Sequence, residues 1–246
     1  DDNFGDLATF QALVAELETR DMHLVLDGVF NHTSSDSAYF DRYGRYPGMG
    51  ACEDVNSPYR AWYYFTPASP AGTGVCAGDT NYQAWWGFDS LPKLNTTDDG
   101  VGVRDYLYRV TPAIGAYWLE QGADGWRLDV AGDVNSTFWQ DWRPYIRTAN
   151  PDAITIAEEW GDASRFILGD QLDSAMNYRF RNALIGLLRE TDWQDTNSFI
   201  AALTVTQFDS LMHSIEEDYP AEAWYAALNL VDSHDTNRVL IPLDQD

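Results

Sequence analysis

Five short apolar segments with the character of β-strands, separated by helical segments, constrain the fold of this chain more than any other feature. Apolar residues recur at helical spacing over residues 6–20, 103–118 and 138–146. The strand-like runs lie at residues 23–30, 123–130, 153–157, 172–177 and 226–231. Strands that alternate with helices pair in parallel, because a parallel neighbour is reached only through a crossover connection. The pattern therefore predicts an α/β fold with a parallel sheet.

A long segment without periodicity interrupts the alternation after the first strand. It covers residues 33–100 and is rich in glycine, proline and aromatic residues. A structureless loop of this length is unusual in a compact domain unless it has a function. We therefore expect residues 33–100 to form an inserted subdomain. Residues 1–32 and 101–246 would form the two parts of the surrounding α/β domain.

Two α/β folds fit this order of elements. A (β/α)8 barrel typically needs about 250 residues, and the chain has 246. A closed barrel of this kind has more strands than the sequence shows, so we expect a partial barrel and an excerpt of a longer chain. A flavodoxin-like open sheet is the alternative, and the pattern alone does not separate the two folds.

The charge of the chain restricts its partners. Asp and Glu number 39 against 15 Lys and Arg, which gives a formal net charge of −24 at pH 7. Such a surface repels phosphate backbones and anionic lipids, so we expect no nucleic-acid and no membrane partner. No apolar run approaches the roughly 18 residues that a membrane helix needs. A neutral substrate is compatible with this composition.

The two cysteines, Cys52 and Cys76, both lie in the inserted segment. A bridge between them would close a long loop and restrict the unfolded chain. We predict this disulfide, although the sequence also allows two unrelated thiols. Disulfides are typical of oxidising compartments, so the bridge indicates a secreted or extracytoplasmic protein.

Polar residues stand at the carboxyl ends of the strand-like runs. In chain order they are Asp27, His32, Arg127, Asp129, Glu158, His234 and Asp235. The carboxyl ends of parallel barrel strands converge on one face, so residues far apart in sequence become neighbours there. A single acid in such a place is more often a helix cap or half of a salt bridge, and Asp27 with Arg127 could be a purely structural pair. Taken together, the set predicts an active site.

Four segments resemble the ordered sequence motifs of the α-amylase family, glycoside hydrolase family 13. They are Asp27-Gly28-Val29-Phe30-Asn31-His32, Gly125-Trp126-Arg127-Leu128-Asp129, Glu158 with Trp160, and Val231-Asp232-Ser233-His234-Asp235. Leu91-Pro92-Lys93-Leu94-Asn95 and Met176-Asn177-Tyr178 are similar to the neopullulanase, cyclomaltodextrinase and maltogenic amylase branch. The resemblance implies a (β/α)8 TIM barrel of which strands three to seven are visible, with the insert, called domain B, after strand three.

The resemblance also implies a reaction. The protein would be a retaining glycoside hydrolase that cleaves α-glucosidic bonds in starch-like α-glucans, pullulan or cyclodextrins by double displacement. Asp129 would be the nucleophile and Glu158 the acid/base. Asp235, the third catalytic acid, would bind sugar hydroxyls as the ring distorts. Glu159 competes with Glu158, which we prefer because it directly follows a small residue, Ala157, at the end of its strand.

The implied substrate-binding residues are Asp27, His32, Arg127 and His234. The arginine would orient the nucleophile through charge-assisted hydrogen bonds, and the two histidines would donate hydrogen bonds to the sugar ring. Among the aromatic residues of the insert, we expect Trp86 first to stack on a sugar face. Its competitors are Tyr63, Tyr64, Trp85 and Phe88.

The resemblance implies no cofactor for the chemistry itself, but many family members hold a structural calcium ion. Asn31 matches one of its ligands, whereas Lys93 stands where those members have an acid. Calcium at this place stays open, and other oxygen ligands of the insert could bind an ion instead. Gly132 and Asp133 also depart from the residues that usually follow the nucleophile. The preference for α-1,4 or α-1,6 linkages therefore cannot be read from the sequence.

Two other functions stay open at this point. A glucanotransferase would use the same covalent intermediate, with a sugar in place of water as the acceptor. A catalytically inactive barrel would serve for binding, but such proteins usually lose an acid, and all three acids are present here. The expected partner is an α-glucan oligo- or polysaccharide, and the sequence does not indicate an oligomeric state.

Overall fold

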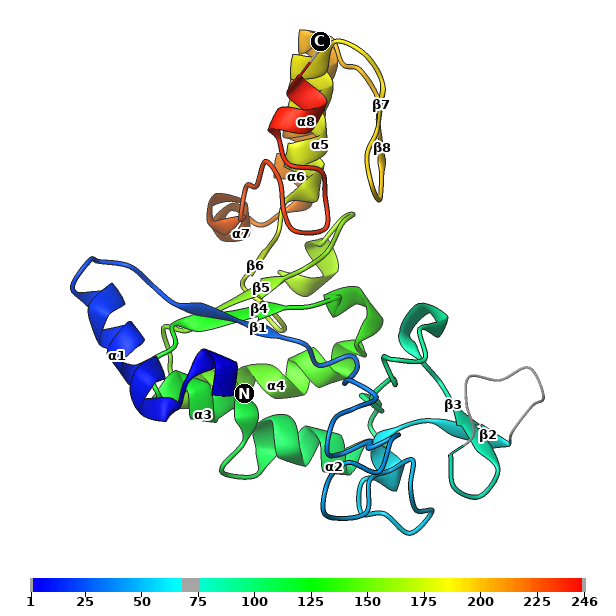
Figure 1. Ribbon diagram of the computed structural model, residues 1–246. Coiled ribbons are helices and arrows are strands. Elements are labelled where there is room, and N and C mark those ends of the chain that lie inside the picture. Colours follow the sequence, from blue (N-terminus) through cyan, green and yellow to red (C-terminus); the bar gives the residue numbers. More distant parts are fainter. Residues whose placement is uncertain (1, 68–75, 245–246) are drawn as a thin grey trace. The chain divides into compact units, whose positions relative to one another are not determined.

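The computed structural model describes residues 2–67 and 76–244 (Figure 1). The chain divides into two compact units, Asp1–Ile154 and Thr155–Asp246. The boundary falls after the first residue of strand β5 (Ile154–Ala157), and each unit has its own buried residues. None of the described helices is long and apolar enough to cross a membrane.

Two parallel strands form the centre of the first unit. β1 (Val25–Gly28) pairs with β4 (Gly125–Leu128), and Asp27 lies opposite Arg127 in this register. A short turn, η1 (Asp2–Phe4), and helix α1 (Leu7–Glu18) precede β1. The helix begins at Asp6, whose side chain accepts a hydrogen bond from Thr9 N at 2.9 Å. The predicted helix and strand are therefore both present, with slightly shorter ends.

The helix predicted over residues 103–118 is divided in the structure. α2 (Val101–Arg104) continues as the π-helical turn η4 (Asp105–Arg109), and α3 (Ile114–Glu120) follows after Pro112. Proline has no N–H to donate and disfavours a helical conformation in the residue before it, so the helix stops there. The next helix, α4 (Ser136–Ala149), was predicted in one piece and is capped by Asn135, which accepts from Thr137 N at 2.9 Å.

Indole rings build much of the core of this unit. Trp126 of β4 and Trp142 of α4 are buried, with ring centroids 6.3 Å apart. Trp126 Nε1 donates to the backbone oxygen of Gly115 on α3 at 3.1 Å. A Cβ at Gly115 would lie 2.6 Å from the Trp142 ring, so this close approach requires glycine. Helices α3 and α4 thereby cover one face of β1 and β4 (Figure 1).

The insert has a small aromatic core of its own. Strands β2 (Phe65–Pro67) and β3 (Thr80–Tyr82) are antiparallel, and the 3-10 turns η2 (Arg60–Trp62) and η3 (Trp85–Gly87) flank them in sequence. Phe40 is fully buried and packs edge-on against Tyr63 and Tyr82 at 4.8 and 4.7 Å. Cys52 and Cys76 form a disulfide, which confirms that prediction. The domain boundaries placed near residues 32 and 100 stay a prediction.

The second unit contains one parallel strand pair and several helices. β5 pairs with β6 (Ser174–Ala175), and Ala157 lies opposite Ala175. Helix α5 (Tyr178–Arg189) begins at Asn177, whose side chain accepts from Phe180 N at 3.0 Å. The other elements are η6 (Ser164–Phe166), β7 (Trp193–Gln194), β8 (Phe199–Ile200), α6 (Val205–Asp218), α7 (Ala221–Ala226) and α8 (Leu240–Leu243).

The prediction of a strand over residues 226–231 is wrong. Ala226 is the last residue of α7, and Leu228 alone pairs with Met176 in an isolated parallel bridge. Leu228 and Val231 are 44% and 42% exposed. Helix α7 takes up Ala226, and the rest of the segment contains Asn229, a residue type that is depleted in strands, so the pairing stops after one residue.

Candidate active site

Arg127 joins two carboxylates at the end of the central strands. The register of β1 and β4 places Asp27 beside it. Arg127 Nη1 donates to Asp27 Oδ1 at 2.7 Å and to Asp129 Oδ1 at 2.8 Å. The side chains of Arg127 and Asp129 are 13% and 19% exposed, so their charge-assisted hydrogen bond is largely shielded from water. The guanidinium therefore fixes the orientation of both carboxylates.

The chain turns sharply directly after Asp129. Val130 adopts φ 39° and ψ 50°, in the left-handed region that β-branched residues rarely enter. A residue held in this region costs about 1–3 kcal/mol, and such positions cluster at functional sites. The 3-10 turn η5 (Ala131–Asp133) follows. The fold therefore enforces a strained backbone next to the predicted nucleophile.

A stack of three rings connects the buried His32 with the surface of the insert. His32 stacks on Trp85 with 5.1 Å between ring centroids, and Trp85 stacks on Trp86 at 5.3 Å. His32 is 9% exposed, whereas Trp86 is 80% exposed. Trp85 Nε1 donates to Asp133 Oδ2 at 2.7 Å. The stack is therefore tied to the turn that follows Asp129 and ends in an open indole face.

His32 is held as a neutral ring. Burial lowers the pKa of His32 below its ordinary value of 6.5, and the positive charge of Lys93 lowers this pKa further, although Asp133 opposes both effects. Asn31 Nδ2 lies 3.2 Å from His32 Nδ1. An amide nitrogen only donates, so Nδ1 accepts and the ring proton is on Nε2. His32 can therefore donate a hydrogen bond through Nε2 near pH 7.

Glu158 lies directly after β5 and is nearly buried, at 5% exposure. Trp160 Nε1 donates to Glu158 Oε1 at 3.1 Å, and the Trp160 ring stacks on Tyr178 at 4.0 Å between centroids. Glu159 instead lies 3.6 Å from the exposed Arg165. The two neighbouring glutamates thus differ in their surroundings, and Glu158 has the enclosed position suited to proton transfer away from bulk water.

Asp235 lies in a tight loop of the second unit. Its Oδ2 is 3.1 Å from His234 Nε2, and its backbone N donates to Ser233 Oγ at 3.2 Å. Tyr178 OH donates to the same Ser233 oxygen at 3.1 Å. Tyr178 also stacks on Trp160, which donates to Glu158. A continuous series of contacts therefore links Glu158 with the loop of Asp235 within this unit.

The predicted catalytic residues fall into two groups. Asp129 belongs to the first unit, together with Asp27 and Arg127, whereas Glu158 and Asp235 belong to the second. Direct hydrogen bonds join the members of the first group. Glu158 and Asp235 are linked indirectly, through Trp160, Tyr178 and Ser233.

Two residues that contact these groups, Asp133 and Tyr178, were not among the predicted site residues. Asp133 accepts the hydrogen bond of Trp85, and Tyr178 links Trp160 to the loop of Asp235. The available signals were the place of Asp133 just after the nucleophile and the presence of Tyr178 in the motif at residues 176–178.

Asn31 is fully buried, and its Oδ1 has no hydrogen-bond partner among the described residues. An unpaired buried oxygen is suited to a cation. Lys93, however, pairs with His32 in an antiparallel bridge and brings a positive charge to this place. Within residues 2–67 and 76–244, no group of three or more His, Cys, Asp or Glu side chains is arranged to hold a metal ion. The residues around Asn31 do not fit a calcium site built on carboxylates.

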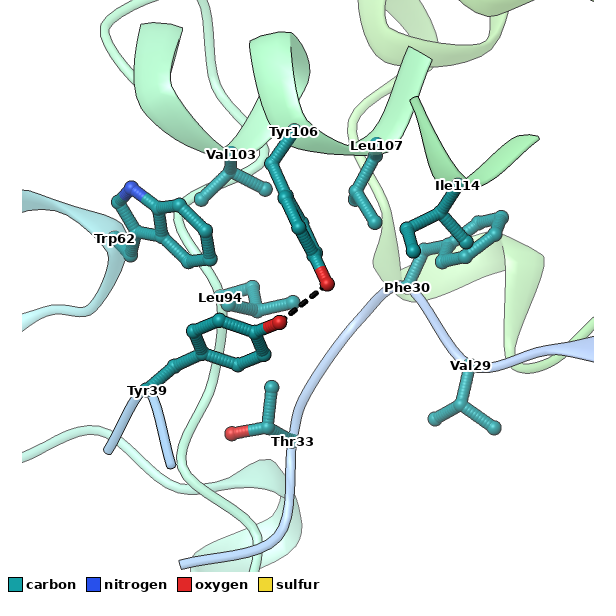
Figure 2. A pocket seen from close by; sticks show the side chains of 10 residues that line it. All are labelled: Val29, Phe30, Thr33, Tyr39, Trp62, Leu94, Val103, Tyr106, Leu107 and Ile114. Atoms are coloured by element: carbon teal, nitrogen blue, oxygen red, sulfur yellow. Dashed lines mark hydrogen bonds between the residues drawn. The ribbon is translucent and has the colours of Figure 1, made fainter. Parts of the chain in front are cut away.

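A separate hollow lies between the insert and the helices that follow it (Figure 2). Its cavity volume is about 230 Å³. Tyr39 and Tyr106 join their hydroxyls across it in a hydrogen bond, and burial raises the pKa of Tyr106. The lining residues are Val29, Phe30, Thr33, Tyr39, Trp62, Leu94, Val103, Tyr106, Leu107 and Ile114. None of the predicted site residues is among them, so this hollow is not the predicted catalytic pocket.

Parallel strands that end in a carboxylate–arginine cluster, with an insert after the first of them, are typical of α/β-barrel enzymes, whose active sites lie at the carboxyl ends of the strands. The family profile described as "Alpha amylase, catalytic domain" matches residues 1–246. The chain therefore belongs to the α-amylase family. The predicted fold class, a partial (β/α)8 barrel with parallel strands, is confirmed.

Named relatives match nearly the whole chain. An amylopullulanase of Thermoanaerobacter thermohydrosulfuricus is 40% identical over 98% of this chain, which corresponds to 17% of that protein. Neopullulanase 2 of Thermoactinomyces vulgaris is 35% identical over 98% of this chain and 37% of its own length. The crystal structure of a debranching enzyme from Nostoc punctiforme is similar with a TM-score of 0.81 and 31% identity, over 97% of this chain and 48% of that one. The chain thus spans less than half the length of these relatives.

Proposed function

We propose that the protein containing this chain is a retaining glycoside hydrolase that cleaves α-glucosidic bonds in starch-like α-glucans, pullulan or cyclodextrins. The observation that carries the proposal is the pair of hydrogen bonds from Arg127 to Asp27 and Asp129. A nucleophile must meet the anomeric carbon in one orientation, and this clamp holds Asp129 in one orientation. The names of the relatives, amylopullulanase and neopullulanase 2, support the substrate class.

In the proposed reaction, Asp129 attacks the anomeric carbon while the bond from that carbon to the leaving oxygen breaks. Glu158 gives its proton to the leaving oxygen, and a covalent glycosyl ester forms on Asp129. Glu158 then takes a proton from a water molecule, whose oxygen attacks the anomeric carbon and releases Asp129 with the configuration retained. In retaining enzymes that use this chemistry, the two carboxyl groups are about 5–5.5 Å apart.

The sugar is proposed to lie against the ring stack of the insert. Neutral His32 would donate from Nε2 to a ring hydroxyl, and the open indole of Trp86 would pack on a sugar face. Asp235 and His234 would bind further hydroxyls, through interactions that strengthen as positive charge develops at the anomeric carbon. An uncharged oligosaccharide also avoids the repulsion that a chain with a net charge of −24 exerts on anions.

We also propose that the protein folds in an oxidising compartment and is secreted or extracytoplasmic. The disulfide between Cys52 and Cys76 supports this location, because reducing compartments seldom allow structural disulfides.

The test compares the full-length protein with its Asp129→Asn variant on starch, pullulan and β-cyclodextrin, with products separated by chromatography. We expect the variant to lose about 1,000-fold or more in kcat, because an amide is neither a nucleophile nor an anionic partner for Arg127. Asp152→Asn, at an exposed residue after α4, is the matched control and should keep full activity. Undiminished activity of Asp129→Asn would exclude Asp129 as the nucleophile, and products longer than the substrate would identify a transferase.

A further inference from the structure

A hairpin outside every predicted motif contacts the loop that carries Asp235. β7 and β8 are joined by residues 195–198, all within the second unit. Asn197 Nδ2 donates to the backbone oxygen of Asp235 at 2.8 Å. Asp195 Oδ1 accepts from Asn237 N at 3.1 Å, and Thr196 Oγ1 donates to Asn237 Oδ1 at 3.3 Å. The turn of this hairpin therefore binds the chain at Asp235 and two residues beyond it.

Asp195 is fixed in turn by a buried ion pair. Its Oδ2 lies 2.6 Å from Arg181 Nη2, and both side chains are 0% exposed. Arg181 belongs to α5, one turn after Tyr178, whose hydroxyl donates to Ser233 Oγ. A single helix thus anchors the loop on both sides of Asp235, directly at Ser233 and through Asp195 on the far side. Removing one member of a buried ion pair is destabilising, and an intact pair can fix the geometry of the groups around it.

These contacts restrain the main chain around Asp235. Its backbone N donates to Ser233 Oγ, and its backbone oxygen accepts from Asn197. The side-chain carboxylate is 35% exposed. Both main-chain groups are thus bound by the protein while the carboxylate stays accessible to a ligand. A displacement of about 1 Å in a group that acts on the transition state can cost about 100-fold in rate.

We propose that Asn197 and Asp195 are positioning residues that hold Asp235 at the orientation required by the distorted sugar ring. The inference rests on the proposed function, because it assigns these residues to the same site. They act through the backbone of the Asp235 loop and do not touch the substrate.

The test is Asn197→Ala in the full-length protein, because Asn197 is exposed and its loss leaves the buried pair intact. With pullulan or β-cyclodextrin as substrate, kcat should fall about tenfold while KM stays within about twofold, as expected for an interaction made only in the transition state. The Tm should not change. In an Asp235→Asn background, Asn197→Ala should have no further effect on kcat, because the residue it positions has lost its carboxylate.

A second variant, Asp195→Asn, removes the charge that faces Arg181 and should lower both kcat and Tm. Asp192→Asn is the same change directly before β7, at an exposed residue that accepts from Ala202 N, and should leave kcat unchanged. If the double variant loses kcat by the product of the losses of Asn197→Ala and Asp235→Asn, the positioning role is overturned. An unchanged kcat of Asn197→Ala would also overturn it. A wild-type protein inactive on every α-glucan would instead overturn the proposed function, and this inference with it.

Discussion

Glu158 and Glu159 are adjacent in sequence but have different neighbours. Glu158 is 5% exposed and accepts a hydrogen bond from Trp160 Nε1, whereas Glu159 pairs with Arg165 near the surface. The sequence separates the two through the small residue, Ala157, that precedes Glu158, and through the place of Trp160 in the motif. The structure adds a physical difference, because the indole fixes one oxygen of Glu158 and the stacked Tyr178 fixes the indole.

This difference predicts unequal effects of two identical substitutions. Glu158→Gln should lower kcat on pullulan or β-cyclodextrin by about 100- to 10,000-fold, the usual contribution of a general acid/base. Glu159→Gln, the matched control, should change kcat by less than about twofold. Azide needs no general base, so it should restore turnover of an activated aryl glycoside by Glu158→Gln only. The opposite ranking of the two variants would transfer the acid/base role to Glu159.

At the scale of elements, prediction from the sequence succeeded where local periodicity decides the outcome. Helix α1 and strands β1, β4 and β5 lie within their predicted segments, and α4 contains its predicted segment and extends beyond both ends of it, because each is defined by one apolar stripe or run. The predictions failed where single residues interrupt an apolar pattern, as Pro112 does in the predicted helix and Asn229 in the predicted strand at residues 226–231.

The candidate site shows the same division. Asp27 and Arg127 could be predicted as neighbours, because the parallel pairing of two recognisable strands brings them together. The contact of Asp195 with Asn237 joins residues 42 positions apart, neither of which lies in a periodic segment. Contacts between two loops depend on tertiary packing, which no local pattern encodes.

The disulfide of the insert gives a prediction at this scale. Cys52 and Cys76 are 24 residues apart in sequence, and closing a loop of that size stabilises a fold by about 3 kcal/mol in the chain-entropy description. The double variant Cys52→Ser/Cys76→Ser should therefore unfold several degrees lower in calorimetry. Dithiothreitol should lower the Tm of the wild-type protein and leave that of the variant unchanged. Equal Tm values for the two proteins without reductant would contradict a stabilising bridge.

At the scale of the whole chain, the composition is strongly acidic, with 39 Asp and Glu residues and 15 Lys and Arg residues. Repulsion among exposed carboxylates weakens the folded state, and salt relieves it because the screening length falls from about 10 Å at 0.1 M to about 3 Å at 1 M. Buried pairs such as Arg181–Asp195 are screened much less. Added salt should therefore reduce the repulsion while leaving intact the pairs that hold the candidate site.

The Tm should consequently rise when KCl is increased from about 0.05 M to about 1 M. Helix α6 offers a local check, because its last turn has no basic residue and carries the exposed Glu216 and Glu217, where the helix dipole favours cations. Glu216→Gln/Glu217→Gln should raise the Tm by about 1–3 °C at low salt, and less at high salt. Glu222→Gln is the opposite control, because Glu222 lies in the first turn of α7, where the dipole favours negative charge. A Tm that falls as KCl is added would show that surface ion pairs outweigh the repulsion in this protein.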